Sequence, residues 1–247
     1  MITVNDSDWQ SRTRLLIGEE GIHKLNNAHV LVAGLGGVGA FATEILARAG
    51  IGTLTLIDSD KFNKSNINRQ TAAFNSTVGK YKTDVLAERI NDINPECIVY
   101  KENYYLKDEK IPLILSKYKY SYVLDAIDSV SPKVFLIYHA IKAELKVISS
   151  MGAGGKFDPM KLKIADISES YECPLAYDIR KKLHKLGIYT GVKVVFSDEK
   201  VAKEKFFPVD SIPNKKSIVG TISYMPALFG AYAASQIIRD ILEIKKS

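Results

Sequence analysis

The 247-residue sequence predicts an α/β fold with a mostly parallel sheet, helices on both faces and a C-terminal extension. Two observations lead to this prediction. Short apolar runs alternate with longer segments of helical periodicity, and turn residues separate them. One of the turns is rich in glycine and lies between an apolar run and a helix. Parallel strands joined by right-handed crossovers bring polar residues together at the carboxyl edge of the sheet, where we expect a ligand to bind.

Residues 29–60, HVLVAGLGGVGAFATEILARAGIGTLTLIDSD, form the unit around which the chain is organised. The pattern predicts a strand at 30–33, a tight turn, a helix at 40–49 that ends at Gly50, and a strand at 54–57 that leads to Asp58. Glycines in such a turn let the backbone approach a phosphate at a helix N-terminus. An acidic residue after the second strand is typical of a Rossmann-like ribose site, although a small-residue packing turn is the alternative.

The elements around this unit follow the same alternation. One or two short helices are expected at 9–25, and a loop with a short helical turn at 59–70. Thr77 can cap a helix that runs to about Asn94, where Pro95 ends it. The elements expected next are a strand at 98–100, a helix at 109–116, a strand at 120–126, a helix at 132–143, a strand at 146–151 and a small-residue turn at 152–155.

Beyond Gly155 the rhythm changes. Strands are expected at 161–167 and 192–197 on either side of a basic helix at 174–186, followed by a lysine-rich loop at 198–216. The last element is a long apolar helix at 223–244. Polar residues and Pro226 interrupt the most apolar window, so we expect a buried helix and no stable membrane insertion.

The composition is that of an ordinary globular protein, with 46% hydrophobic and 25% charged residues. The two cysteines, Cys97 and Cys173, are too few for a disulfide scaffold or a paired C-x-x-C zinc site. They fit a reducing cytoplasm, and no secretory signal is evident. A net charge of +6 makes an acidic polymer a candidate partner, with a merely basic surface as the alternative.

Polar residues after the glycine turn form a set that a dehydrogenase does not need. Carboxylates follow two of the strands, an Asn and an Arg share a helical face, and a Lys begins a helix. Cations neutralise phosphate charge and an aspartate can hold Mg²⁺, so the set fits a metal-bound triphosphate. Any one of these residues alone could be a cap or a solvated charge. The set consists of Asp58, Asp60, Asn66, Arg69, Lys82 and Asp128.

The motifs GLGGVG, IDSD, SNINRQ, VGKYK and DAIDS, in this order and spacing, resemble the ubiquitin-activating-enzyme-like ATP-binding fold of the molybdopterin and thiamin pathway activators. This resemblance runs from about Arg12 to Gly155. Within that family the sequence is similar to the tRNA threonylcarbamoyladenosine dehydratases, because it also contains SMGAGG, CPLA followed by Arg180 and a basic helix, and VKVVFS. The later motifs extend the likeness to nearly the whole chain.

The resemblance implies a single ATP-binding domain over residues 1–247, with a nucleotide-binding core at about 26–155 and a substrate-binding extension at about 156–247. It implies a cytoplasmic, homodimeric, adenylate-forming ligase that uses ATP and Mg²⁺ to cyclise threonylcarbamoyladenosine in tRNA with loss of water. A sulfur-transfer protein is a further candidate partner. The basic segments 180–182 and 200–216, with Lys185 and Lys193, are expected to contact tRNA phosphates.

Residue roles follow from the same resemblance. Asp58, beside Asp60, would bind the ribose, and Asp128 would bind Mg²⁺. Arg12 would reach into the ATP site of a neighbouring subunit. Catalytic roles are thus implied for Arg12, Arg69, Lys82 and Asp128, and phosphate-binding roles for Gly34, Gly36, Gly37, Gly39, Asn66, Arg69 and Lys82.

The sequence also departs from the broader family. Relatives that activate ubiquitin-like proteins usually carry C-x-x-C zinc pairs, and several carry a catalytic cysteine. This chain has no such pairs, and we interpret Cys97 as a buried structural thiol and give Cys173 no favoured chemical role. An intramolecular ring closure needs no enzyme nucleophile.

Three other functions remain open at this point. The nearest is an adenylating activator of a ubiquitin-like or sulfur-carrier protein C-terminus. An NAD-dependent dehydrogenase would explain the glycine turn but would leave Arg69, Lys82 and Asp128 without a role. The third is a noncatalytic, nucleotide-dependent RNA-binding scaffold.

Overall fold

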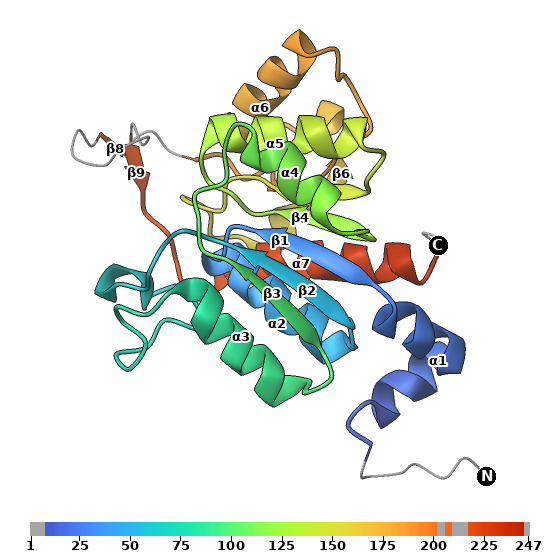
Figure 1. The fold of residues 1–247 in the computed structure, drawn as a ribbon. Helices are drawn as coiled ribbons and strands as arrows, with labels where there is room; N and C mark the ends of the chain where they lie inside the picture. Colours follow the sequence, from blue (N-terminus) through green and yellow to red (C-terminus); the bar gives the residue numbers. More distant parts are fainter. Residues whose placement is uncertain (1–7, 202–205, 209–216, 245–247) are drawn as a thin grey trace.

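A computed structural model describes residues 8–201, 206–208 and 217–244. They form a three-layer α/β structure whose central sheet has seven strands in the order β3-β2-β1-β4-β5-β7-β6 (Figure 1). The strands are β1 His29–Ala33, β2 Thr53–Ile57, β3 Ile98–Glu102, β4 Tyr122–Asp125, β5 Val147–Ser150, β6 Leu162–Asp166 and β7 Lys193–Ser197. A separate pair consists of β8 Phe206–Pro208 and β9 Ser217–Val219.

Helices cover both faces of this sheet. One layer contains α2, α3 and α7, with α1 packed at its end, and the other contains α4, α5 and α6 (Figure 1). Their bounds are α1 Ser11–Asn26, α2 Gly37–Ala49, α3 Lys82–Ile93, α4 Lys110–Lys117, α5 Val130–Lys142, α6 Pro174–Lys185 and α7 Tyr224–Ile241. Single 3₁₀ turns occur at η1 Lys64–Asn66, η2 Pro159–Lys161 and η3 Ile167–Glu169.

The strand order reverses beside β1. This strand pairs in parallel with β2 on one side and with β4 on the other, whereas β6 at the far edge runs antiparallel to β7. The predicted mostly parallel sheet is therefore confirmed. In an open α/β sheet the crevice between the loops that leave two such central strands is where ligands bind. Here those loops are the glycine turn after β1 and residues 126–129 after β4.

The C-terminal segments complete the same sheet and its cover. Strands β6 and β7 extend the sheet beyond β5, and α7 packs along α2. The approach is close because a Cβ at Gly230 would lie 2.4 Å from the carbonyl oxygen of Val38. The apolar face of α7 is buried, as the sequence predicts. Within the described residues no helix is long and apolar enough to cross a membrane.

Two predicted elements differ in the structure. The helix expected to begin after Thr77 begins at Lys82, because the Thr77 hydroxyl closes a turn instead. It accepts from the Phe74 N–H and donates to the Ala72 carbonyl, each at 2.8 Å, and Gly79 then has a φ of +88°. The expected loop at 198–216 contains β8, which pairs with β9, and residues 202–205 and 209–216 lie outside the described residues.

Candidate functional site

The glycine turn is held in place by contacts that exclude larger residues. Gly34 has a φ of +88°, and a Cβ there would lie 2.7 Å from the carbonyl oxygen of Ala126. A Cβ at Gly39 would lie 1.8 Å from the oxygen of Gly34, and one at Gly37 would lie 2.7 Å from the Cβ of Pro226. Protein packing thus requires glycine at these positions.

Gly36 differs from the other glycines of the turn. A Cβ there would have the amide nitrogen of Gln70, at 3.9 Å, as its nearest neighbour, so packing within the chain does not require this glycine. Gly36 is also the N-cap of α2, where no side chain satisfies the helix N–H groups. Open space in front of a helix N-terminus is where an anion such as a phosphate binds.

Asp58 links the second strand to the glycine turn. One of its oxygens accepts from the Leu35 N–H at 2.7 Å, and the other accepts from the Asp60 N–H at 2.8 Å. Burial raises the pKa of Asp58, and the nearby Lys82 ammonium opposes that shift. A carboxylate has about four lone pairs, so two remain for ribose hydroxyls. Asp58 therefore lies against the glycine turn, and its binding to a ribose stays a prediction.

Lys82 is the first residue of α3, as predicted, and its ammonium lies beside the carboxylates of Asp58 and Asp60. The Nζ atom lies 2.8 Å from Asp60 Oδ2 and 3.6 Å from Asp58 Oδ2, and the side chain is only 6% exposed. The two carboxylates hold this cation beside the glycine turn, which keeps its charge in place before any phosphate arrives.

The last residue of η1, Asn66, supplies an amide, and Arg69 after it supplies a guanidinium. Asn66 is buried, and its Oδ1 accepts from the Asn63 N–H, so its NH₂ group is the end that could donate to a phosphate. The guanidinium of Arg69 donates to the Ser65 carbonyl at 2.8 Å. Burial lowers the pKa of Arg69 and the charge of Asp128 opposes that shift, so the two side chains are close enough to interact.

Asp128 is exposed in the loop after β4, and an ion pair that the sequence did not reveal supports that loop. Asp125 and Lys133 are both fully buried, with Lys133 Nζ 2.9 Å from Asp125 Oδ2. Asp125 also accepts from the Ser149 hydroxyl at 2.7 Å and from the Ile127 N–H at 3.1 Å. The first Asp of DAIDS is therefore structural, and the second Asp faces solvent at the site.

Gln70 was missed as a site residue although it closes the SNINRQ motif. Its side chain is 6% exposed, its Nε2 atom lies beside Gly36, and among the described residues its Oε1 atom is buried without a hydrogen-bond partner. A polar residue at the end of a motif that already supplied Asn66 and Arg69 was the available signal. An unpaired buried amide oxygen is costly, so it marks a place that a ligand or water could satisfy.

Lys156 ties together the loops of the extension at the carboxyl edge. It is 1% exposed, and its ammonium donates to the carbonyls of Glu172 at 3.1 Å, Ser197 at 3.2 Å and Glu199. Burial lowers the pKa of Lys156. The sequence does not distinguish Lys156 from a surface lysine. Only the tertiary structure reveals that its buried ammonium joins these loops. Cys173, which precedes α6, is buried close enough to Lys156 to interact with its charge.

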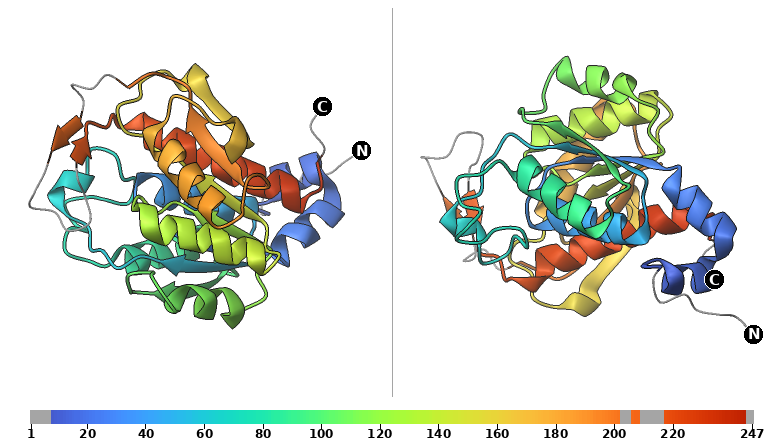
Figure 2. Two further views of the ribbon diagram at one scale, coloured as in Figure 1. Left: turned by 90° about the horizontal axis from the view of Figure 1, so that it is seen from above. Right: turned by 60° about the horizontal axis from the view of Figure 1, so that its bottom comes forward.

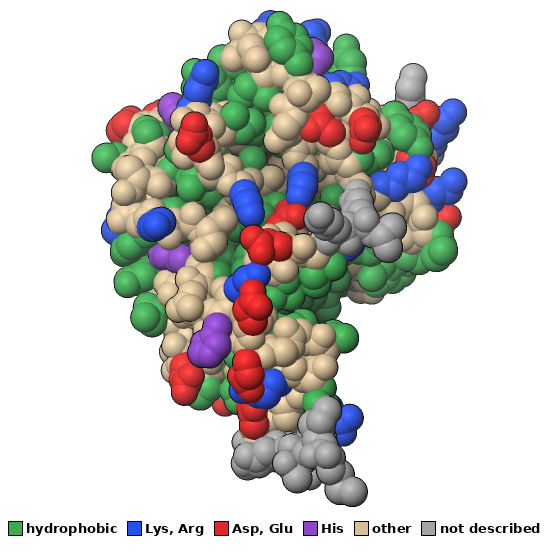
Figure 3. All heavy atoms as spheres, turned by 90° about the vertical axis from the view of Figure 1, so that its right-hand side faces the viewer, with side chains coloured by type: hydrophobic (Ala, Val, Ile, Leu, Met, Phe, Trp, Pro, Cys, Tyr) green, Lys and Arg blue, Asp and Glu red, His purple; other side chains and the backbone are tan. Residues whose placement is uncertain are grey.

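Arg12 is remote from these residues within one chain. It is exposed on α1, which joins the amino ends of the strands because the Leu25 carbonyl accepts from the Gly52 N–H. Figure 2 shows α1 at one end of the molecule and the β8–β9 pair at the other. Figure 3 views the α1 end, where acidic, basic and apolar side chains are interspersed. A role for Arg12 in its own glycine turn is therefore excluded by distance along the sheet.

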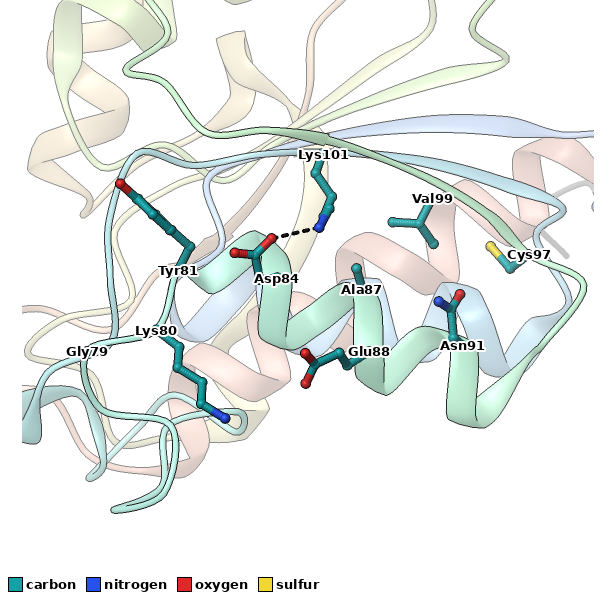
Figure 4. A pocket seen from close by; sticks show the side chains of 10 residues that line it. All are labelled: Gly79, Lys80, Tyr81, Asp84, Ala87, Glu88, Asn91, Cys97, Val99 and Lys101. Atoms are coloured by element: carbon teal, nitrogen blue, oxygen red, sulfur yellow. Dashed lines mark hydrogen bonds and ion pairs between the residues drawn. The ribbon is translucent and has the colours of Figure 1, made fainter.

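A groove of about 710 Å³ lies between α3 and the edge strand β3 (Figure 4). None of the predicted site residues lines it, and the ion pair between Lys101 and Asp84 spans part of it. Cys97 lies at one end, and burial raises the pKa of its thiol to about 11, so the reactive thiolate is not populated at neutral pH. This groove carries no chemistry.

The arrangement suits a nucleotide with a metal ion. Lys82 lies beside Asp58, whose carboxylate accepts from the glycine turn, and Arg69 is close enough to the exposed Asp128 for their charges to interact. Within the described residues no group of three or more His, Cys, Asp or Glu side chains could hold a metal ion. A hard cation at Asp128 would therefore need the phosphate oxygens as its other ligands, which is how Mg²⁺ binds with nucleotides.

Comparisons with known proteins agree with this geometry. A family model described as the ThiF family matches residues 10–247. The tRNA threonylcarbamoyladenosine dehydratase of Bacillus subtilis (strain 168) is 40% identical over 246 residues, 96% of each chain. That of Escherichia coli (strain K12) is 39% identical over 208 residues, 80% of this chain and 77% of the relative. A crystal structure of the E. coli tRNA N6-threonylcarbamoyladenosine dehydratase in complex with ATP has a TM-score of 0.86 at 34% identity and covers 98% of both chains.

Proposed function

Because this chain belongs to the ThiF family, we propose that it catalyses the ATP-dependent dehydration of threonylcarbamoyladenosine in tRNA. The observation that carries the proposal is the open space at Gly36, in front of the α2 N-terminus, in a turn that Asp58 joins to the Lys82 ammonium. Relatives that match nearly the full length of the chain carry that activity in their names. The extension after residue 155 would help to hold the substrate.

Each residue of the site then has a place around ATP. Asp58 and Asp60 would hold the ribose side, and the N-terminus of α2, Arg69 and Lys82 would hold the phosphates. Asp128 would hold Mg²⁺, which supplies further positive charge to the phosphates when bound. Asn66 and the buried Gln70 would orient the phosphates as hydrogen-bond partners. The glycine turn after β1 and the loop that carries Asp128 after β4 leave the sheet at its switch point, which supports the assignment.

The proposed reaction is carboxylate activation followed by ring closure. The threonyl carboxylate attacks the α-phosphorus of ATP. The bond between the α-phosphorus and the oxygen that bridges to the β-phosphorus breaks, and pyrophosphate departs. Arg69 and Lys82 would stabilise the negative charge that grows on the phosphate oxygens. An atom of the same modified base then attacks the acyl carbon and expels AMP. Because this attack is intramolecular, its effective molarity is high and no enzyme nucleophile is needed.

The alternative is an adenylating activator of a ubiquitin-like or sulfur-carrier protein. It would use the same ATP site but would accept a flexible protein C-terminus. The full-length match to dehydratases favours the tRNA reaction, as does the lack of a metal-binding cluster among the described side chains. A sulfur-transfer protein remains a candidate partner rather than the substrate, and we place the enzyme in the cytoplasm with its tRNA.

Mass spectrometry of tRNA nucleosides tests the proposal. After incubation with ATP and Mg²⁺, threonylcarbamoyladenosine should lose about 18 Da, the mass of the water removed by an intramolecular closure. AMP and pyrophosphate should form in equal amounts. An unchanged nucleoside together with adenylation of a carrier-protein C-terminus would support the alternative instead.

We also propose that the enzyme is a homodimer in which Arg12 completes the ATP site of the partner subunit. Arg12 cannot reach its own site, and α1 exposes 85% of Leu16 and 49% of Leu15. Apolar side chains exposed on one helix favour burial in a contact between subunits. Arg12 on the same helix would then be carried across the interface.

Mixing two inactive variants tests this contact. Equal amounts of Arg12→Ala and Lys82→Ala protein should recover about a quarter of wild-type activity, because random exchange makes half of the dimers hybrid and each hybrid has one intact site. Each variant alone should stay inactive. If subunits exchange and the mixture stays inactive, Arg12 does not act in the partner's site.

A further inference from the structure

Helix α6 begins beside the loop that follows β5. A Cβ at Gly152, in the loop after β5, would lie 3.8 Å from Cys173 Sγ and 3.7 Å from Leu175 Cβ, so the first turn of α6 is at the carboxyl edge. The inner face of the helix is buried through Ala176, Ile179 and Leu183. The opposite face of the helix is exposed.

Two of the basic residues expected to contact tRNA already have partners within the chain. Arg180 points inward, and its guanidinium donates to the carbonyls of Ser170 at 2.6 Å and Ile167 at 3.3 Å. Its Nη1 group therefore anchors the helix to the segment that precedes it. Lys193 pairs with Asp240 at 2.6 Å, so its charge is already compensated. Most of the lysine-rich segment 200–216 lies outside the described residues.

Four exposed residues of α6 form one continuous surface, which we call the α6 face: Tyr177, Lys181, His184 and Lys185. Their spacings of four and three positions put them on one side of the helix, and together with Arg180 they line a shallow groove of about 400 Å³. The ring of His184 lies 5.0 Å from that of Tyr189, which extends the aromatic surface beyond the helix. Tyr177 is 56% exposed and Tyr189 is 61% exposed.

The charge on the α6 face is uncompensated. Among the described residues neither Lys181 nor Lys185 has a carboxylate within ion-pair distance, although many other lysines of this chain are paired. The helix rises about 1.5 Å per residue, so Tyr177 and Lys185 are about 12 Å apart along the axis. Cations that alternate with exposed aromatic rings suit a nucleic-acid strand, because the cations can bind its phosphates and the rings can stack on its unstacked bases.

We propose that the α6 face binds the RNA strand next to the modified base, with Lys181 and Lys185 on phosphates and Tyr177 stacked on a neighbouring base. This inference rests on the proposed function, because the dehydration site places the modified base at the carboxyl edge, where α6 begins. Arg180 and the buried side of α6 hold the surface rigid, so little ordering is needed when RNA binds.

The test compares tRNA binding by three proteins with the wild type. A Lys181→Ala/Lys185→Ala variant should flatten the slope of log affinity against log salt by about 1.4, because each lost phosphate contact on looped RNA contributes about 0.7. Tyr177→Ala should weaken binding about fivefold or more, because it removes a stacked base. A Lys110→Ala/Lys119→Ala variant removes the same charge from the α4 region and should keep the wild-type slope.

Two further readings separate the inference from the proposed function. ATP affinity should be the same in all variants, since none of these residues touches the nucleotide site. If the wild type dehydrates threonylcarbamoyladenosine but the α6 variants bind tRNA with the salt slope of the α4 control, the α6 face is not the RNA surface. If the α6 variants lose tRNA affinity while the wild type shows no dehydration, the surface assignment stands and the proposed reaction is wrong.

Discussion

Replacing Asp128 by Ala should abolish adenylation while the protein stays folded. The carboxylate is exposed in the loop after β4 and close enough to Arg69 to affect its pKa, so its loss removes charge from the site and nothing from the core. Losing a metal ligand or a comparable electrostatic contact at a reacting phosphate should cost at least about a hundredfold in rate. The free energy of unfolding should change by no more than about 0.5 kcal/mol, as for other surface substitutions.

ATP–pyrophosphate exchange and urea unfolding measure these two effects separately. The matched control is Asp92→Ala, which removes an exposed carboxylate from α3, away from the site. Wild-type exchange by the Asp128→Ala protein would refute the metal-ligand assignment. A large loss of stability would show instead that Asp128 holds its loop in place.

The neighbouring carboxylate should behave in the opposite way. Asp125→Ala should lower the free energy of unfolding by about 3–5 kcal/mol, because it leaves the ammonium of Lys133 buried without a counter-charge. It also removes the acceptor for Ser149 and for the Ile127 N–H, which orders the loop that carries Asp128. Activity at low temperature should therefore fall as well, through that loop.

A second substitution checks the cause. Because Lys133 in Asp125→Ala has lost its only described carboxylate partner, adding Lys133→Met removes the stranded charge and should restore much of the stability. Urea unfolding of the single and double variants measures the recovery. An unfolding midpoint in the Asp125→Ala protein equal to that of the wild type would mean that the buried pair contributes nothing.

Much of the fold follows from local patterns. The strands β1 and β2 were predicted to within one residue, because short apolar runs have strong local preferences. The helix α2 ends where predicted but begins at Gly37, so the last glycines of the predicted turn form its first turn. Among the motif residues, Lys82 lies near Asp58 and Arg69 lies near Asp128, since these residues follow or precede elements whose ends share one edge of the sheet.

Local patterns failed where a side chain had a choice of partners. Thr77 is of a residue type that often caps helices, yet its hydroxyl closes a turn before α3. Arg180 belongs to a run of basic residues that the sequence presents as equivalent, yet it turns inward to two carbonyls. Which of two competing hydrogen bonds a side chain forms depends on segments far away in the sequence. The hydrophobic periodicity of the sequence therefore does not predict it.

The sequence by itself determined the α/β architecture and the glycine turn at the start of α2, because each depends on spacing along the chain. Only the tertiary structure decided which Asp of DAIDS is buried with Lys133 and which faces the site. It alone placed Arg12 at the opposite end of the sheet and buried Lys156 among three carbonyls. Burial and charge pairing arise between segments far apart in the chain, so their outcome depends on packing, which the order of residues does not display.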